Sequence, residues 1–143
     1  MKYLAALGVI VMLWLHCRMQ APSCTLARAW HAARPHYDYL QVVELRADRT
    51  GELVMGEGQL VRTQVTIHYA VAGDAIRFEY VAGSHAASRS IGFALTTGDF
   101  PVVERDYDGA REHHYGCRLE LAENPFPPDT TSDPHVMYYA CER

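Results

Sequence analysis

The sequence is short of lysine and has no hydrophobic run long enough to span a bilayer. Among its 143 residues there is one lysine, Lys2, and the formal net charge is −4 at pH 7. A chain of this charge repels phosphate backbones, which argues against nucleic-acid binding. The main apolar run covers residues 3–15, fewer than the ~20 residues that a bilayer-spanning helix needs. The length and a hydrophobic fraction of 49% predict one globular domain.

The motifs of the common catalytic and metal sites are also missing. There is no Cys-x-x-Cys, no Gly-x-Ser-x-Gly and no complete phosphate-binding glycine loop. His113 and His114 are adjacent, and adjacent strand residues point to opposite faces, so they are not expected to share an ion. We therefore predict no catalytic residue, no metal and no cofactor, and interpret the chain as a non-enzyme. The enzyme alternative needs a polar cleft, for which His68, His114 and Glu79 are the candidates.

The N-terminal segment has the pattern of an export signal. Lys2 and the free amino terminus precede the apolar run of residues 3–15, as in secretory signals. Ala21 and Ser23 place small residues at the −3 and −1 positions before Cys24, as signal peptidases prefer. We predict that residues 1–23 are a signal peptide, with an uncleaved membrane anchor as the alternative. Export to the periplasm or cell envelope follows from either interpretation.

A cysteine close behind such a segment also indicates a bacterial lipoprotein. Cys17 lies nearer to the apolar run, and Cys24 directly follows the small residues. Either is the predicted lipidation site if the signal is of the lipoprotein type. The protein is then expected to contact a membrane only through its N-terminal segment or a lipid.

The two remaining cysteines predict a disulfide. Cys117 and Cys141 form an even pair in the folded part of an exported chain. If Cys117 faces inward with Tyr115, and Cys141 faces inward with Tyr139, the two meet between neighbouring strands. Such a bridge closes a loop of about 24 residues and contributes roughly 3 kcal/mol. Two buried free thiols are the alternative.

A short helix is predicted before the main domain. Leu26, Trp30 and Ala33 follow the i, i+4, i+7 spacing of a helix over residues 25–34, and Pro35 ends it. We assign residues 24–36 to a linker that contains this helix.

The remainder predicts an all-β domain over residues 37–143. Apolar and polar residues alternate in short segments that are separated by turn residues every 8 to 14 positions. About eight strands in an antiparallel meander are expected to close into a barrel, or to stack as a sandwich. The predicted strands cover residues 37–46, 52–55, 59–71, 75–82, 90–97, 102–106, 111–121 and 135–142, with turns at 48–51 and 98–99.

This order of elements resembles the bacterial lipocalin-like, calycin-type barrels. The resemblance rests on the Asp-Arg-Thr-Gly-Glu turn at residues 48–52 after a long strand, followed by successive hairpins. It extends over residues 30–142 as a pattern, while the lipocalin Gly-x-Trp motif is absent before Trp30. The resemblance implies an eight-stranded barrel with an apolar cavity, and it implies no particular site residue.

Two binding functions are consistent with these features. The first is a carrier of a small apolar molecule or lipid, which predicts a wide, open, apolar barrel. The second is an accessory or inhibitor module that binds an envelope protein, which predicts a filled barrel and an exposed apolar patch. Leu40 and Val42 lie on the opposite strand face from Val43 and Leu45, so we predict a partner-binding face at Leu40 and Val42.

Overall fold

The computed structural model describes residues 24–57, 60–81, 88–127 and 136–143. The predicted signal segment, including Cys17, lies outside these residues. The described part is all-β and contains no helix. Its eight strands are β1 (Ala29–His31), β2 (Tyr39–Leu45), β3 (Thr50–Glu57), β4 (Leu60–Ala72), β5 (Ala75–Tyr80), β6 (Arg89–Asp106), β7 (Gly109–Leu121) and β8 (Met137–Glu142).

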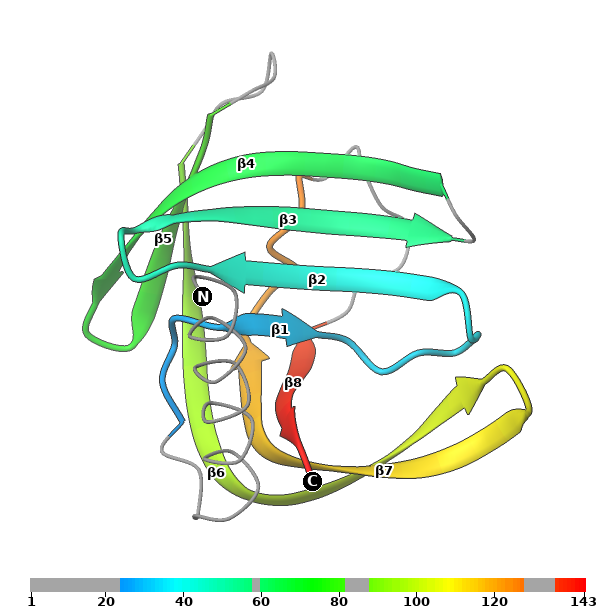
Figure 1. The fold of residues 1–143 in the computed structure, drawn as a ribbon. Coiled ribbons are helices and arrows are strands. Elements are labelled where there is room, and N and C mark those ends of the chain that lie inside the picture. The colour runs from blue at the N-terminus through cyan, green and yellow to red at the C-terminus, as the bar shows by residue number, and fades with distance from the viewer. Residues whose placement is uncertain (1–23, 58–59, 82–87, 128–135) are drawn as a thin grey trace, which may run out of the picture.

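The strands form an antiparallel meander that closes on itself. Each strand pairs with the next one along the chain, and β8 returns to β1 (Figure 1). The closing contact between β1 and β8 consists of a single register pair, His31 opposite Tyr139. The predicted all-β meander is therefore confirmed, and its hydrogen-bonded neighbours form a closed ring. We call this short contact between β1 and β8 the seam.

The helix predicted over residues 25–34 is wrong, because this segment contains β1. Trp30 pairs with Val43 of β2 and is fully buried, and Ala32 is 1% exposed. The indole Nε1 of Trp30 donates a hydrogen bond to the carbonyl oxygen of Leu26, at 2.9 Å. A spacing of four residues fits one face of a strand as well as a helix turn, and the burial of Ala32 follows the strand period. Residues 29–31 of this segment consequently form one strand of the ring.

The turn predicted at residues 98–99 is also wrong, because β6 runs through it as one long strand. The register with β7 shifts by one residue between Thr97 and Phe100, which is a β-bulge. Bulges bend strands, and Figure 1 shows the long β6–β7 hairpin bending sharply along its length. The predicted number of strands agrees with the structure only because β1 was missed and β6 was divided in two.

The β2–β3 turn forms where it was predicted, and Arg49 is its residue in the left-handed region, with a φ of 71°. Asp48 Oδ1 accepts hydrogen bonds from the backbone N of Thr50, at 3.1 Å, and from its hydroxyl, at 2.6 Å. Gly51 is required because a Cβ there would lie 2.2 Å from the carbonyl oxygen of Glu44.

Large side chains fill the interior of the ring. The residues that are buried to less than 2% exposure come from all eight strands and from the segment that follows β7, where Phe126 folds back into the core. Tyr80 fixes this segment by donating its hydroxyl hydrogen to the carbonyl oxygen of Pro125, at 2.5 Å. The largest of these side chains belong to Trp30, Tyr115, Tyr138, Phe78, Phe126, Leu45, Leu53, Ile67, Ile76, Ile91, Leu119 and Leu121.

The disulfide predicted between Cys117 and Cys141 is wrong, because Cys117 bonds to Cys24. Their Cα atoms are 5.7 Å apart, and 93 positions separate them in the sequence. Cys117 lies opposite Ala140. Tyr138 and Ala140 are the buried residues of β8, so Cys141 has the opposite parity from the one predicted. Cys141 is disulfide-bonded as well.

The Cys24 bridge ties the start of the described chain to the centre of β7. In the chain-entropy model a loop of this length stabilises the fold by about 4–5 kcal/mol. A sulfur atom in a disulfide carries no thioether-linked lipid, so the structure corrects the prediction of lipidation at Cys24. The same prediction for Cys17 lies outside the described residues.

Candidate functional site

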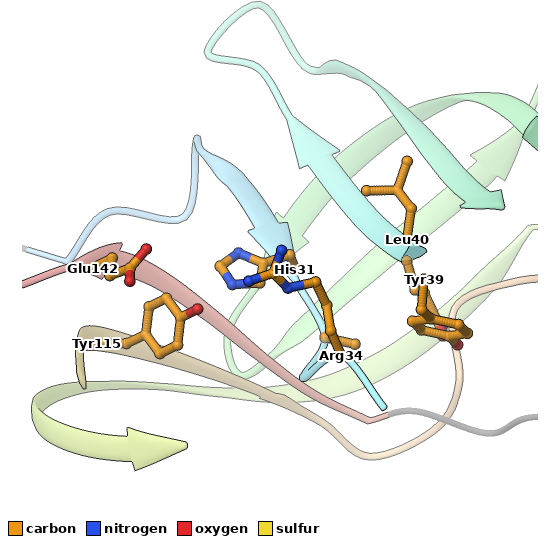
Figure 2. A pocket seen from close by; sticks show the side chains of 8 residues that line it. His31, Arg34, Tyr39, Leu40, Tyr115 and Glu142 are labelled. Carbon is orange, nitrogen blue, oxygen red and sulfur yellow. The ribbon is translucent and has the colours of Figure 1, made fainter. Parts of the chain in front are cut away.

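A pocket of about 340 Å³ lies beside the seam. Figure 2 shows Tyr115 and Glu142 on one side of it and Tyr39 and Leu40 on the other, with His31 and Arg34 between them. These residues come from β1, the β1–β2 connection, β2, β7 and β8. The pocket therefore exists only because the ring closes. Its lining consists of His31, Ala32, Arg34, Tyr39, Leu40, Gln41, Tyr115 and Glu142.

A buried carboxylate forms hydrogen bonds with two residues of the pocket lining. Glu104 of β6 is 0% exposed, and burial of a charge is costly unless the charge is paired. Its Oε2 accepts hydrogen bonds from the backbone N of Arg34, at 2.9 Å, and from the Arg34 Nε, at 3.2 Å. Its Oε1 accepts a hydrogen bond from the hydroxyl of Tyr115. Both carboxylate oxygens are thus satisfied, and Arg34 and Tyr115 are fixed in position.

Arg34 links this carboxylate to a second one. Its Nη2 lies 3.0 Å from Asp106 Oδ1 at the end of β6. The guanidinium group therefore spans two acidic residues of the same strand, a geometry that suits its planar fork of donors. Burial raises the pKa of Tyr115, and the hydrogen bond to Glu104 raises it further. The Tyr115 hydroxyl therefore stays protonated near neutral pH and acts as a hydrogen-bond donor.

His113 joins two carboxylates at the edge of the pocket. Its Nδ1 lies 2.5 Å from Glu142 Oε1, and its Nε2 lies 2.9 Å from Asp106 Oδ2. The hydrogen bond to Glu142, followed by the one to Asp106, raises the pKa of His113 above its usual 6.5. The imidazolium form is thereby favoured, because only this form donates from both nitrogens.

The pKa of His31 is shifted in the opposite direction to that of His113. Its ring meets that of Tyr115 edge-on, with the centroids 4.9 Å apart. Burial lowers the pKa of His31 below 6.5, despite the nearby carboxylate of Glu104. His31 therefore presents a neutral imidazole to the pocket at neutral pH, with one donor and one acceptor.

A chain of amide and hydroxyl groups forms the floor on the β2 side. Gln41 is 1% exposed, and its Oε1 accepts a hydrogen bond from the Tyr39 hydroxyl at 2.8 Å. Its Nε2 donates to the Tyr138 hydroxyl at 3.1 Å. Burial raises the pKa of Tyr138. These hydrogen bonds fix the polar side chains of this part of the pocket next to the apolar core.

The structure places the predicted partner face partly at this pocket. Leu40 is 41% exposed and lines the pocket, on the outer face of β2 as expected. Val42 is half-buried on the same face, where it pairs with His31 and Val54. Strand parity thus predicted the outward position of Leu40, while a partner at this face stays a prediction.

The three residues that were named for a catalytic cleft lie at two separate places in the structure. His68 and Glu79 are opposite each other on β4 and β5. His114 of β7 instead approaches Asp99 at 3.0 Å and Glu112 at 3.5 Å. Among the described residues, no group of three or more His, Cys, Asp or Glu side chains has a metal-binding arrangement.

The charged centre of the site was not predicted from the sequence. Glu104, Arg34 and Glu142 come from distant positions in the chain and form no motif. One signal was available, because Glu104 shares the inward parity of Val102 in β6. A carboxylate on the buried face of a strand indicates a buried ion pair or a functional site.

Comparisons with protein-family models, with curated proteins and with solved structures find no match to this chain. Within the described ranges, no helix has the length and hydrophobicity that crossing a bilayer requires.

Proposed function

We propose that this protein is a non-catalytic binding protein and that it takes a small polar molecule into the pocket beside the seam. The observation that carries the proposal is the fixed set of polar groups around this pocket. Arg34 and Tyr115 are held by the buried Glu104, and Gln41 is held by two tyrosines. Groups that are ordered before binding lose little conformational entropy when a ligand arrives.

The size of the pocket supports a small ligand. A volume of about 340 Å³ is at the lower end of the range for small-molecule sites. Leu40 and Ala32 supply apolar contacts, while His31 offers a neutral donor and acceptor. A few fixed polar groups among apolar and aromatic walls are typical of ligand sites.

The packed interior of the ring argues against a lipid as the ligand. Trp30, Phe78, Phe126 and Tyr138 occupy the interior, where a lipocalin-like carrier would hold its apolar ligand. In this proposal the chain is a lipocalin-like barrel in architecture, with its ligand at the seam instead of the centre. The apolar carrier expected from the sequence is thus replaced by a binder of polar molecules.

A role in binding is favoured over catalysis because the reactive groups are occupied by one another. Glu104 accepts three hydrogen bonds, and Arg34 is paired with two carboxylates. The raised pKa of Tyr115 keeps its hydroxyl protonated. We propose that these groups orient a ligand and transfer no proton to it.

An envelope-protein partner is the second candidate function, and one observation favours it. Tyr37 and Tyr107 form an exposed edge-to-face pair, with ring centroids 5.5 Å apart and exposed fractions of 56% and 88%. Exposed tyrosines are enriched in protein interfaces. Tyr37 lies in the same β1–β2 connection as Arg34, which lines the pocket.

Export is part of the proposal. The Cys24–Cys117 disulfide supports an oxidising compartment, since structural disulfides are rare in the cytosol. We propose the periplasm or cell envelope, as expected from residues 1–23.

Native mass spectrometry of the protein purified from its own cells tests the proposal. Leu40→Trp fills the pocket, and Val71→Trp is the matched control, because Val71 is 40% exposed and does not line the pocket. We expect a small polar passenger on the wild type and on Val71→Trp, and its loss from Leu40→Trp. A passenger with an acyl chain, or one that Leu40→Trp retains, would contradict the proposed site.

A further inference from the structure

His113 connects two parts of the molecule that the backbone does not connect directly. It lies on β7, and its imidazole is 12% exposed between Asp106 at the end of β6 and Glu142 at the end of β8. Glu142 also lines the pocket. The backbone of Glu142 is held by the pairing of β8 with β7, and the contact at Nδ1 therefore orients the side chain that forms one wall of the pocket.

The two carboxylates depend on His113 to different degrees. Asp106 has two further cationic neighbours, Arg34 at 3.0 Å and Arg111 at 3.7 Å. In the described part of the chain, His113 is the one cationic partner of Glu142, whose side chain is 52% exposed. Loss of the imidazolium charge would thus leave Asp106 paired and Glu142 unpaired.

Asp106 and Glu142 also differ in how they respond to deprotonation of His113, because the imidazole then has one donor fewer. A protonated histidine donates from both nitrogens, whereas a neutral histidine donates from one and accepts at the other. A carboxylate is an acceptor and cannot donate in return. Neutral His113 can therefore donate a hydrogen bond to only one of the two carboxylates. Because Glu142 is half-exposed, its carboxylate can accept hydrogen bonds from water instead, and giving up the contact with His113 costs it less free energy.

We propose that His113 is a pH-dependent clasp, which holds Glu142 against the pocket while protonated and releases it when neutral. The consequence for ligand binding rests on the proposed function, whereas the release itself does not. Release removes the Glu142 wall and widens the pocket beside Tyr115. Ligand binding would then be controlled by pH at a residue that does not line the pocket.

The charges around His113 favour a transition above its ordinary pKa. Hydrogen bonds to Glu142 and Asp106 raise the pKa of His113, and they outweigh the opposing effect of burial. The transition is therefore expected above pH 6.5. His113 contacts Asp106 of β6, Glu142 of β8 and the ring of Tyr115 on its own strand. Arg34 and Arg111 pair with Asp106, Glu104 accepts the hydrogen bond of Tyr115, and the charge of His113 also acts on the neutral His31 of β1.

NMR titration of the full-length folded protein tests the clasp without any ligand. The ¹⁵N resonances of the His113 imidazole and the backbone amide of Glu142 are followed from pH 5 to pH 9. We expect the Glu142 amide to titrate with the midpoint of His113. Glu142→Gln should lower the His113 midpoint by on the order of half a pH unit, the effect of one partly exposed ion pair. His114→Gln is the control, because His114 contacts Asp99 and Glu112 and does not line the pocket.

Two results would overturn the clasp. One is a Glu142 amide that does not respond while His113 titrates, and the other is an unchanged His113 midpoint in Glu142→Gln. Because Glu142 is half-exposed, this variant is expected to fold, and its amide spectrum checks that.

Failure of the clasp and failure of the binding function are separable. If a small polar molecule binds in the pocket, the clasp predicts that its Kd changes across the His113 midpoint in the wild type and not in His113→Gln. A Kd that is equally independent of pH in both proteins would contradict the clasp and leave the binding site standing. A normal NMR titration with no molecule bound at any pH would contradict the proposed function alone.

Discussion

The hydroxyl of Tyr115 donates a hydrogen bond to the carboxylate of Glu104, which is completely buried. This contact joins β7 to β6 beneath the pocket and keeps one oxygen of a buried charge satisfied. The same carboxylate fixes Arg34 through two further hydrogen bonds. The stability of the ring and the order of the pocket therefore depend on the same residues.

The first prediction concerns this hydrogen bond. Tyr115→Phe keeps the ring and its contact with His31 but leaves Glu104 Oε1 without its donor. We expect a loss of about 1–3 kcal/mol in the free energy of unfolding, the cost of an unsatisfied buried acceptor. Urea denaturation measures it. Tyr107→Phe is the control, since Tyr107 is 88% exposed, and equal stability of the two variants would contradict the role given to Tyr115.

The second prediction concerns the disulfide pairing. Cys24→Ser and Cys117→Ser break the same bridge, so each should cost about 4–5 kcal/mol and the double variant should cost no more than either alone. Thermal unfolding compares the three proteins. Peptide mapping under non-reducing conditions should recover Cys24 linked to Cys117. A peptide that links Cys117 to Cys141 would contradict the structure.

The third prediction concerns pH and the two histidines of the site. The pKa of His113 is raised in the folded protein, so its stabilising contribution is complete below pH 6.5 and disappears as the pH rises through the folded value. The pKa of His31 is lowered, so its neutral form favours folding above pH 6.5 and this contribution disappears as the pH falls. Urea midpoints of His113→Gln and wild type should converge at alkaline pH. Equal differences between them at pH 5.5 and pH 9 would contradict the assignment.

The fourth prediction concerns two glycines that are required for different reasons. Gly51→Ala places a Cβ against the carbonyl oxygen of Glu44 and forces the β2–β3 backbones apart, at a cost of about 1–3 kcal/mol. Gly73→Ala has open space around it but a φ of +60°, which costs roughly 1–2 kcal/mol. Hydrogen exchange separates the two variants. Only Gly51→Ala should increase exchange at the β2–β3 pairing.

Alternation of apolar residues predicted most of the ring. In β5 the inward residues are Ile76, Phe78 and Tyr80, as expected, and in β4 Val65, Ile67 and Tyr69 are buried. These strands are polar on one face, so their parity is unambiguous. In β8 the sequence is apolar on both faces, and the parity was assigned to the wrong one.

The site could not be predicted in the same way. Strand period gives the face of a residue but not the neighbour that it meets after the ring has closed. His31 meets Tyr115 because β1 pairs with β8, a contact of one register pair that leaves no trace in the local sequence. The bulge between Thr97 and Phe100 likewise bends β6 and sets the position of Glu104. Long-range pairing and local irregularity together decide the composition of the pocket.

Binding in the pocket beside the seam is the central claim, and fragment binding measured by NMR tests it most directly. The panel contains a carboxylate, an amine, a monosaccharide, inorganic phosphate and a medium-chain fatty acid, each titrated into wild type, Leu40→Trp and Val71→Trp. The account predicts that at least one polar fragment shifts the backbone amides of His31, Leu40 and Glu142 in the wild type and in Val71→Trp, and not in Leu40→Trp. Shifts confined to other residues, or binding of the fatty acid alone, would contradict it.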